Sequence, residues 1–281
     1  MRITYSLLAL AVLPALCAER QVDPTFLRRS VPHVKEQPAD VTTSTCRYKP
    51  VFGAGDLDTS VIRGVARFGE MTVLPGGSSK LVSYPAEEQV YVILEGAGAL
   101  HYGDEKAPVR KNDFMYLPAG IGHGISNASD KPCRLIVMGF KVPAGVRPPP
   151  ELLLANIDDV KKQVVGGHPP SVLYQLLMGS TKSTRDKLAA GHVLTSLFIM
   201  SFEPGGTNFP HHHEQEEEIY LVLDGEGDMA AGGGMDGIEG RHPAKAGDAY
   251  FFRLNCTVGF YSKNEAHILA VRSLFPNRTS H

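Results

Sequence analysis

A group of histidine and acidic residues stands directly before a strand-like segment of the chain. One residue separates His211 from His213, and four more separate His213 from Glu218. Because side chains two residues apart in an extended chain face the same side, the two histidines are expected to point together. Glu218 can then return from the following strand to the same place. Two imidazoles and one carboxylate predict a site for a divalent transition metal, with positions left open for a substrate.

The neighbouring residues leave a choice of carboxylate. His212 lies between the two histidines and is expected to face outward. Glu217 is the alternative acidic ligand, but adjacent residues in a strand face opposite sides, so only one of Glu217 and Glu218 can point inward.

An internal repeat indicates which elements position this group. Residues 71–77 correspond to residues 200–206, and residues 89–98 correspond to residues 218–227, both at an offset of 129. Both copies contain short alternating apolar segments, rich in β-branched residues, that end in Gly turns. This pattern predicts two similar all-β units.

The segment between the two copies contains a Pro-rich break followed by a different pattern. Apolar residues recur at helical spacing within residues 151–165, so we expect a short linking helix that packs on a barrel. The residues that carry this spacing are Leu153, Ile157, Val160 and Val164.

Composition limits the class of partner. The 281 residues are 43% hydrophobic and 21% charged, which is ordinary for a soluble globular protein. The net charge is -2 and no run of Lys or Arg occurs, which argues against a large basic face for nucleic acid. We therefore expect that nucleic acid is not a partner.

The first eighteen residues resemble an export signal. Met1-Arg2 is a short positive start, a mostly apolar stretch follows, and small residues allow cleavage after Cys17 or Ala18. The apolar stretch is shorter than the roughly 20 residues of a membrane span. A secreted or periplasmic protein, with no stable membrane span after signal cleavage, is expected. The remaining cysteines allow one disulfide without selecting a pair; they are Cys46, Cys133 and Cys256.

Two motifs in the chain resemble the signatures of the cupin superfamily. The spacing Gly205-x5-His211-x-His213-x4-Glu218-x6-Gly225 matches the first signature. Pro118-x-Gly-x-x-His123-x-x-x-Asn127, in the first copy, matches the second. The chain is therefore similar to a bicupin, which implies an all-β fold of two tandem double-stranded β-helix (jelly-roll) barrels, here with a short linking helix. The expected boundaries are a signal peptide (1–18), an N-terminal arm (19–50), a first barrel (51–145), a linker with the helix and the first strand (146–189) and a second barrel (190–281).

Each copy keeps only part of the ligand set that the resemblance implies. A complete cupin site takes two His and one Glu from the first signature and one His from the second. At the offset of 129, the first copy holds Val82, Tyr84 and Gln89 at the first three positions, so the first barrel is expected to bind no metal. The second copy holds Val258 where the first holds His123. The second barrel thus keeps three ligands and lacks the fourth.

The residues without metal partners are assigned to pockets. In the first barrel, His123 is expected to be a packed, hydrogen-bonded residue, and a metal-free small-molecule pocket would be lined by Tyr84, Gln89, Tyr91 and His123. In the second barrel, Val258 and Tyr261 are expected to line the pocket beside the metal.

Three interpretations of the second barrel remain open. The three residues bind a metal with several open positions, or another residue supplies a fourth ligand, or the group is a solvated remnant at the barrel mouth without a metal. For the fourth ligand, His267 is the best-placed candidate and His192 a weaker one. The residues do not select among Mn, Fe, Ni, Cu and Zn, which all accept imidazole and carboxylate ligands.

The resemblance implies several classes of function. The leading hypothesis is an exported metalloenzyme that acts on a small polar organic substrate in the second barrel, either dioxygenase-like or similar to ureidoglycine aminohydrolases. The alternative is a non-catalytic bicupin that binds a small molecule or resembles storage members, because a fold does not determine a function.

Overall fold

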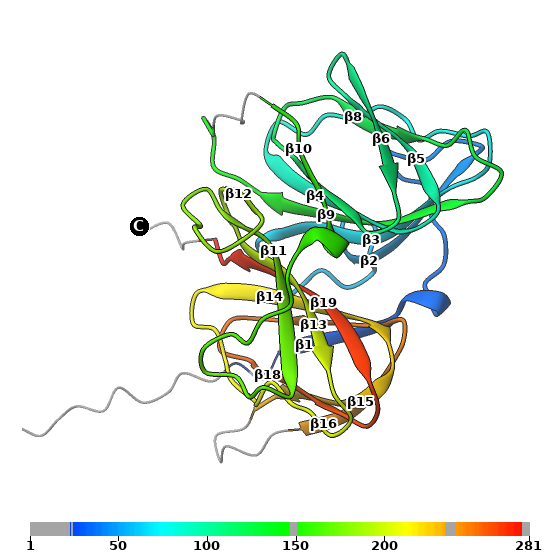
Figure 1. Cartoon of the computed structure of the whole chain (residues 1–281). Coiled ribbons are helices and arrows are strands. Elements are labelled where there is room, and N and C mark those ends of the chain that lie inside the picture. Colours follow the sequence, from blue (N-terminus) through cyan, green and yellow to red (C-terminus); the bar gives the residue numbers. More distant parts are fainter. Residues whose placement is uncertain (1–22, 24, 147–150, 234–239, 277–281) are drawn as a thin grey trace, which may run out of the picture.

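The protein consists of two β-barrels, one above the other (Figure 1). The computed structural model describes residue 23 and residues 25–146, 151–233 and 240–276. Within these ranges the regular elements are strands, apart from two single-turn 3-10 helices, η1 (Val31–His33) and η2 (Ile157–Asp159). The predicted all-β fold of two tandem barrels is confirmed. The described part of the chain has no helix that is long and apolar enough to cross a membrane. The expected signal peptide lies outside the described residues.

The first barrel pairs a six-stranded sheet with a three-stranded sheet. The order of the larger sheet is β10-β7-β4-β9-β3-β2, and that of the smaller is β6-β5-β8. The strands of the larger sheet are β2 (Cys46–Gly53), β3 (Val65–Val73), β4 (Glu87–Glu95), β7 (Asp113–Leu117), β9 (Cys133–Lys141) and β10 (Leu153–Asn156). Those of the smaller are β5 (Ala97–Tyr102), β6 (Glu105–Arg110) and β8 (His123–Ser126).

The second barrel repeats this plan with one additional strand. Its larger sheet has the order β1-β17-β14-β19-β13-β11-β12, and its smaller sheet the order β16-β15-β18. The strands of the larger sheet are β1 (Phe26–Ser30), β11 (Val172–Ser180), β12 (Leu188–Gly191), β13 (Leu194–Phe202), β14 (Glu216–Asp224), β17 (Asp248–Phe252) and β19 (Ala266–Leu274). Those of the smaller are β15 (Glu226–Gly232), β16 (Gly240–Lys245) and β18 (Thr257–Ser262).

The two larger sheets are buried on both faces, and strand periodicity divides their side chains between two environments. In β14, Tyr220 and Val222 belong to the core of the second barrel, whereas Ile219 and Leu221 belong to a separate core that contains residues of both barrels. Because alternate residues of a strand face opposite sides, a continuous apolar run can serve both cores. This alternation also turns Glu218 toward the barrel interior and Glu217 away from it.

The barrels exchange one strand each. Strand β1 precedes the first barrel in sequence but pairs with β17 of the second, with Phe26 opposite Phe252 and Ser30 opposite Asp248. Strand β10 precedes the second barrel but pairs with β7 of the first. The predicted N-terminal arm therefore contains a strand of the other barrel.

The predicted linking helix is wrong. Residues Leu153–Asn156 form β10, and only the single turn η2 follows before an irregular segment. Leu153, Ile157 and Val160 do pack against the core shared by the barrels, whereas Val164 is 51% exposed. The spacing therefore predicted the burial of three of the four residues correctly. The segment forms a strand because the edge of β7 is otherwise unpaired and can form backbone hydrogen bonds with β10, which a helix could not make.

Two buried glutamates fasten one barrel to the other. Glu88 of β4 accepts hydrogen bonds from the backbone N–H groups of residues 192–194, at 2.8, 2.9 and 2.7 Å. Glu217 of β14 accepts hydrogen bonds from those of residues 63–65, at 2.8, 2.7 and 3.1 Å. Both glutamates and both receiving segments are related by the offset of 129, so the two clamps are equivalent and reciprocal.

The three described cysteines carry no disulfide. All three are buried free thiols, Cys46, Cys133 and Cys256. Burial raises the pKa of the Cys133 thiol to about 11, which disfavours the reactive thiolate.

Candidate metal centre

Backbone pairing holds the histidine segment against the neighbouring strand. His211 N–H donates to the Val258 carbonyl at 2.9 Å, and Val258 N–H donates back to the His211 carbonyl at 2.8 Å. The N–H of Asn255 donates to the carbonyl of His213 at 2.7 Å. The two histidines therefore have a fixed backbone beside β18, while Glu218 projects from β14.

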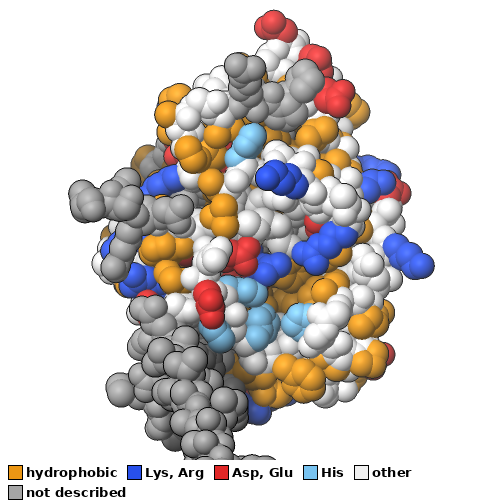
Figure 2. All heavy atoms as spheres, turned by 90° about the vertical axis from the view of Figure 1, so that its left-hand side faces the viewer, with side chains coloured by type: hydrophobic (Ala, Val, Ile, Leu, Met, Phe, Trp, Pro, Cys, Tyr) orange, Lys and Arg blue, Asp and Glu red, His pale blue; other side chains and the backbone are white. Residues whose placement is uncertain are grey.

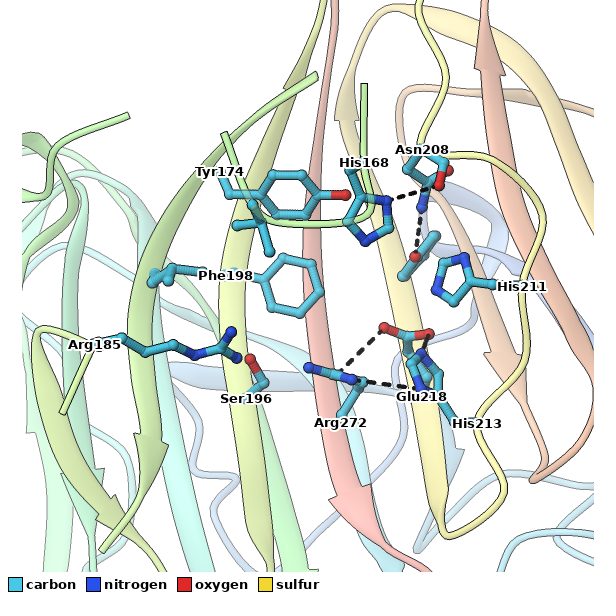
Figure 3. Close-up of a pocket in the computed structure, with 13 residues that line it drawn as sticks. His168, Tyr174, Arg185, Ser196, Phe198, Asn208, His211, His213, Glu218 and Arg272 are labelled. Carbon is cyan, nitrogen blue, oxygen red and sulfur yellow. Dashed lines mark hydrogen bonds and ion pairs between the residues drawn. The ribbon is translucent and has the colours of Figure 1, made fainter. Parts of the chain in front are cut away.

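The structure brings His211, His213 and Glu218 together. One ligand atom from each lies within 4.8 Å of the others (Figure 3). His213 Nε2 lies 3.3 Å from Glu218 Oε2, yet both are buried atoms without a hydrogen-bond partner among the described residues. Buried polar atoms are nearly always paired, so two unpaired ones that face each other fit ligands around a cation.

The hydrogen bonds behind the histidine rings favour metal binding as well. His211 Nδ1 lies 2.8 Å from the Phe209 carbonyl, which can only accept, so Nδ1 carries the proton and Nε2 presents a lone pair. Phe209 adopts a positive φ of 52°, uncommon for a bulky residue, and its carbonyl supports the ring. His213 Nδ1 lies 3.4 Å from Arg272 Nη1, which can only donate, and 3.6 Å from the carboxylate of Glu216, so this ring is held differently from that of His211.

Burial and charge set the protonation of the three residues. Burial lowers the pKa of His211 below its ordinary value, which favours the neutral form that binds metals. Burial alone would lower the pKa of His213 and raise that of Glu218. Their mutual attraction outweighs burial, so the pKa of His213 is raised and that of Glu218 is lowered. These directions favour a protonated His213 beside an ionised Glu218, so a proton lies between the two residues where a metal cation would otherwise bind.

The three residues open into a small cavity of about 100 Å³. On the face shown in Figure 2, histidine side chains gather at a hollow beside acidic and basic side chains. The cavity is lined by Val165, His168, Tyr174, Leu176, Arg185, Ser196, Phe198, Asn208, His211, His213, Glu218, Tyr220 and Arg272.

Donors without a hydrogen-bond partner line this cavity beside the metal ligands. Arg272 stands opposite Glu218 in the β14–β19 ladder, and its Nη1 pairs with Glu216 at 3.2 Å. Its Nε lies 3.9 Å from Glu218 Oε1 and has no hydrogen-bond partner among the described residues, and the buried hydroxyls of Ser196 and Tyr174 have none either. Donors of this kind fit the oxygen atoms of an anionic ligand.

A second arginine stands on the far side of the cavity from His211. Arg185 lies beside Phe198 there (Figure 3). Its guanidinium is 3.6 Å from Asp186 and 52% of its side chain is exposed, so it retains access to solvent and to an entering ligand.

Three of the candidate ligands lie elsewhere. The carboxylate of Glu217 is occupied by the backbone of residues 63–65 and faces the first barrel. His267 lies five residues along β19 from Arg272, about 17 Å in an extended strand, and its Nδ1 pairs with Asp224 at 2.8 Å. The N–H of His192 belongs to the Glu88 clamp, and His192 is absent from the cavity wall.

The two pocket residues expected in the second barrel are also absent from the cavity wall. The Val258 side chain belongs to the barrel core, and only its backbone contacts His211. The ring of Tyr261 lies 3.8 Å below the guanidinium of Arg241 instead. Both residues are on β18, and their spacing did not reveal that this strand supports the histidines with its backbone.

In the first barrel, the four expected pocket residues contact one another. His123 Nε2 lies 3.2 Å from Gln89 Oε1, and its Nδ1 lies 2.9 Å from the Ile121 carbonyl. The rings of Tyr84 and Tyr91 lie 5.9 and 5.5 Å from that of His123. His123 is thus a packed, hydrogen-bonded residue.

Sequence reasoning missed most of the polar cavity wall. The missed residues that carry polar groups are His168, Tyr174, Arg185, Ser196, Asn208 and Arg272. Only Arg272 left a signal, as a charged residue at the end of an apolar closing strand. His168 and Arg185 lie in irregular segments, where periodicity gives no direction to a side chain.

Comparison with known proteins places this geometry in context. The family model described as Cupin domain matches residues 69–139 and 198–271, together more than half of the chain. An oxalate-binding protein from Thermotoga maritima is 30% identical over 63 residues, 22% of this chain and 52% of that protein. The match thus spans about half the length of that relative.

Solved structures resemble the whole two-barrel arrangement. A protein from Pseudomonas aeruginosa, named for its induction by glyoxylate, has a TM-score of 0.72 at 15% identity, covering 94% of this chain and 95% of its own. Oxalate decarboxylase from Bacillus subtilis, in a study of its Mn(II) centres, has a TM-score of 0.65 at 13% identity, covering 90% of this chain and 78% of its own. At such identities the likeness shows the fold alone.

Proposed function

Since this chain belongs to the cupin family, we propose that its second barrel binds one divalent transition metal and, with it, a small organic anion on which it acts as an enzyme. The observation that carries this proposal is the convergence of His211, His213 and Glu218 within 4.8 Å, with His213 Nε2 and Glu218 Oε2 buried, 3.3 Å apart and without a hydrogen bond among the described residues. Two imidazoles and a carboxylate suit Mn, Fe, Ni, Cu or Zn.

The metal would supply one element of the chemistry. A bound divalent cation polarises oxygen atoms of a substrate and acidifies bound water.

The side chains of the cavity supply the rest. Arg272 offers to an anionic oxygen an Nε that lies 3.9 Å from Glu218 without a hydrogen bond, and Ser196 and Tyr174 offer hydroxyls. Phe198 and Leu176 form the apolar wall that excludes water and strengthens these contacts. Together these residues would orient a carboxylate-bearing molecule against the metal ligands.

The size of the cavity restricts the substrate. A volume of about 100 Å³ suits a compound of a few non-hydrogen atoms, and the donors favour a carboxylate over a neutral molecule. By name, one relative binds oxalate and one structural neighbour decarboxylates it, which makes small dicarboxylates the first compounds to test. Oxygenation and hydrolysis both remain within this proposal, and the identity of the metal will separate them.

A second candidate function is the binding of a small anion without catalysis. Glu216, the additional carboxylate near the metal ligands, is paired with Arg272, so the described site offers no free carboxylate to act as a base. This arrangement favours a binding protein.

Export and oligomeric state are proposals of the same kind. We propose that the signal-like residues 1–18 are cleaved, which N-terminal sequencing of the protein from its native host would test. We propose a monomer or homodimer in solution, to be checked by light scattering.

The decisive experiment measures metal in the purified protein and in two alanine variants. We expect close to one equivalent of a transition metal in the wild type and in His212→Ala, and none in His211→Ala. His212 is the matched control because it lies between the two ligands in sequence. Calorimetric titration with oxalate, with and without metal, then tests the anion. A wild type that holds no metal after reconstitution with each of the five ions would overturn the proposal.

A further inference from the structure

A histidine outside both barrel motifs lies at the mouth of the cavity. His168 belongs to the segment that connects η2 to β11, and its N–H donates to the Val165 carbonyl at 3.1 Å, which forms a turn. Backbone hydrogen bonds between Gln163 and Tyr174, at 2.9 and 2.8 Å, anchor the segment to β11. Val165 and His168 line the cavity. The connection between the barrels is therefore also part of the wall of the site.

The ring of His168 is held in one orientation. Its Nδ1 lies 2.8 Å from the carbonyl of Asn208, so Nδ1 carries the proton and Nε2 presents a lone pair. Asn208 is buried, and its side chain bonds to the Tyr220 hydroxyl at 3.0 Å and to the Phe260 N–H at 2.8 Å, which fixes the acceptor. The second ring nitrogen of His168 points into the cavity (Figure 3).

Two imidazoles share this arrangement, and a third lies beside them. The Nδ1 atoms of His211 and His168 each face a backbone carbonyl, whereas His213 Nδ1 lies 3.4 Å from the donor Arg272 Nη1. The ring centroids of His168 and His211 are 5.5 Å apart, and those of His211 and His213 are 5.0 Å apart, each pair edge to face. Metal-binding histidines almost always donate their other ring N–H to an acceptor of this kind.

We propose that His168 is the fourth protein ligand of the metal in the second barrel. This inference rests on the metal site proposed above and concerns its composition. The position of the second-signature histidine is taken by Val258, whose side chain is in the core. His168 reaches the same cavity from the opposite direction along the chain, from the segment between the barrels. The site would then hold three imidazoles and one carboxylate.

His168 lies next to the ligand cluster but outside it. The ligand atoms that lie within 4.8 Å of one another belong to His211, His213 and Glu218, and the ring centroid of His168 is 5.5 Å from that of His211. Coordination therefore requires that His168 approach the other three residues.

The test compares His168→Gln with His212→Gln, a matched change of the same residue type beside the ligands. Zinc is bound to the wild type and to each variant, and its affinity is measured by competition with a chromogenic chelator. X-ray absorption at the zinc edge then counts the bound imidazoles. Thermal melting of the metal-free proteins controls for folding.

We expect three imidazoles in the wild type and in His212→Gln, and two in His168→Gln. Loss of a residue that only supports a ligand costs roughly 10- to 100-fold in affinity, so loss of a direct ligand should weaken zinc binding at least about tenfold. Two imidazoles in a zinc-loaded wild type would overturn the role of His168 and leave the proposed metal site intact. Unchanged zinc affinity in His168→Gln, with weaker binding of oxalate, would also overturn metal coordination by His168 and would show that it contacts the bound anion instead. A wild type that binds no metal would overturn both proposals.

Discussion

Each barrel has an arginine in the same strand pair of its larger sheet, but Arg67 and Arg272 come from different strands of that pair. In the first barrel, Arg67 of β3 stands opposite Gly139 of β9, and a side chain at Gly139 would lie 2.8 Å from Arg67 Cγ. In the second barrel, the corresponding pair is Ser196 of β13 opposite Arg272 of β19. The arginine and the small residue have exchanged strands between the two copies. The guanidinium therefore belongs to equivalent strand pairs in both barrels.

The partners of the two arginines differ, and this difference separates a filled barrel from a site. Arg67 bonds to Glu87, Asp40 and the Tyr84 hydroxyl, each at 3.0 Å, and stacks on the Tyr84 ring. Arg272 has the equivalent glutamate, Glu216, but its Nε lies 3.9 Å from Glu218 and makes no hydrogen bond. Tyr84 and Gln89 take the places of His213 and Glu218 in the repeat, and they fill the space that remains open in the second barrel. A cavity with unpaired polar groups is thus what distinguishes the two copies of one fold.

The largest expected effect is the loss of stability when either glutamate clamp between the barrels is removed. Glu88→Ala and Glu217→Ala each remove a buried carboxylate that accepts from three backbone N–H groups, which should lower the free energy of unfolding by about 3–5 kcal/mol. Glu88 also accepts from the Tyr116 hydroxyl at 2.8 Å, so its loss should cost more. Urea unfolding monitored by circular dichroism measures both, with the exposed Glu105→Ala as the control. A cost below 1 kcal/mol for either variant would refute the role of the clamps.

Metal removal should destabilise the protein through the second barrel only. A ligand present at 100 times its dissociation constant stabilises the folded state by about 2.7 kcal/mol, so chelation should lower the melting temperature of the wild type. The drop should disappear in His211→Ala and persist in His123→Gln. An equal response in all three proteins would show that the metal does not bind at His211.

The two arginines should respond differently to the same substitution. Arg272→Lys keeps the positive charge but removes the guanidinium donor Nε from the cavity, so it should weaken binding of a small carboxylate at least about tenfold. Arg67→Lys should leave binding unaffected and lower stability instead, because its guanidinium bonds to three partners. Calorimetry with oxalate and urea unfolding of both variants measure the contrast. Equal loss of binding in the two variants would contradict it.

The smallest effect concerns the pH dependence of stability at His123. Burial lowers the pKa of His123 below its ordinary value of about 6.5. As the pH decreases, the unfolded chain therefore binds a proton at this residue before the folded protein does. The contribution of neutral His123 to the free energy of unfolding should be fully present above pH 6.5 and decrease below it. His123→Gln should reduce this fall, measured as the difference in melting temperature between pH 7.5 and pH 5.5. An unchanged difference would mean that other groups cause the acid sensitivity.

Much of the fold follows from local sequence. The apolar segments within residues 89–98 and 218–227 predict strands that end in Gly turns, and the spacing of His211, His213 and Glu218 predicts their convergence. These inferences succeed because strand geometry fixes side-chain direction at every second residue. The same rule allows only one of Glu217 and Glu218 to point inward, and the distance to Gly225 in the cupin signature selects Glu218.

The remainder depends on contacts between distant segments. Leu153 and Ile157 have helical spacing, yet the free edge of β7, forty residues earlier, determines that a strand forms. His168 enters the site through a turn whose direction no periodicity encodes. The role of Arg272 in the cavity could not be predicted because it depends on its position opposite Ser196. That strand register is a property of the folded barrel.

The exchange of β1 and β10 has a consequence for the order in which the chain folds. Arg28 of β1 forms an ion pair with Asp248, 220 residues later. During synthesis, β1 must therefore wait until nearly the whole chain has left the ribosome. Contacts of such long sequence separation slow folding, because the entropy of closing the loop is lost before the contact forms. Until then, the edge of β17 is open to β1 of another molecule, and crowded folding conditions would favour intertwined dimers over monomers.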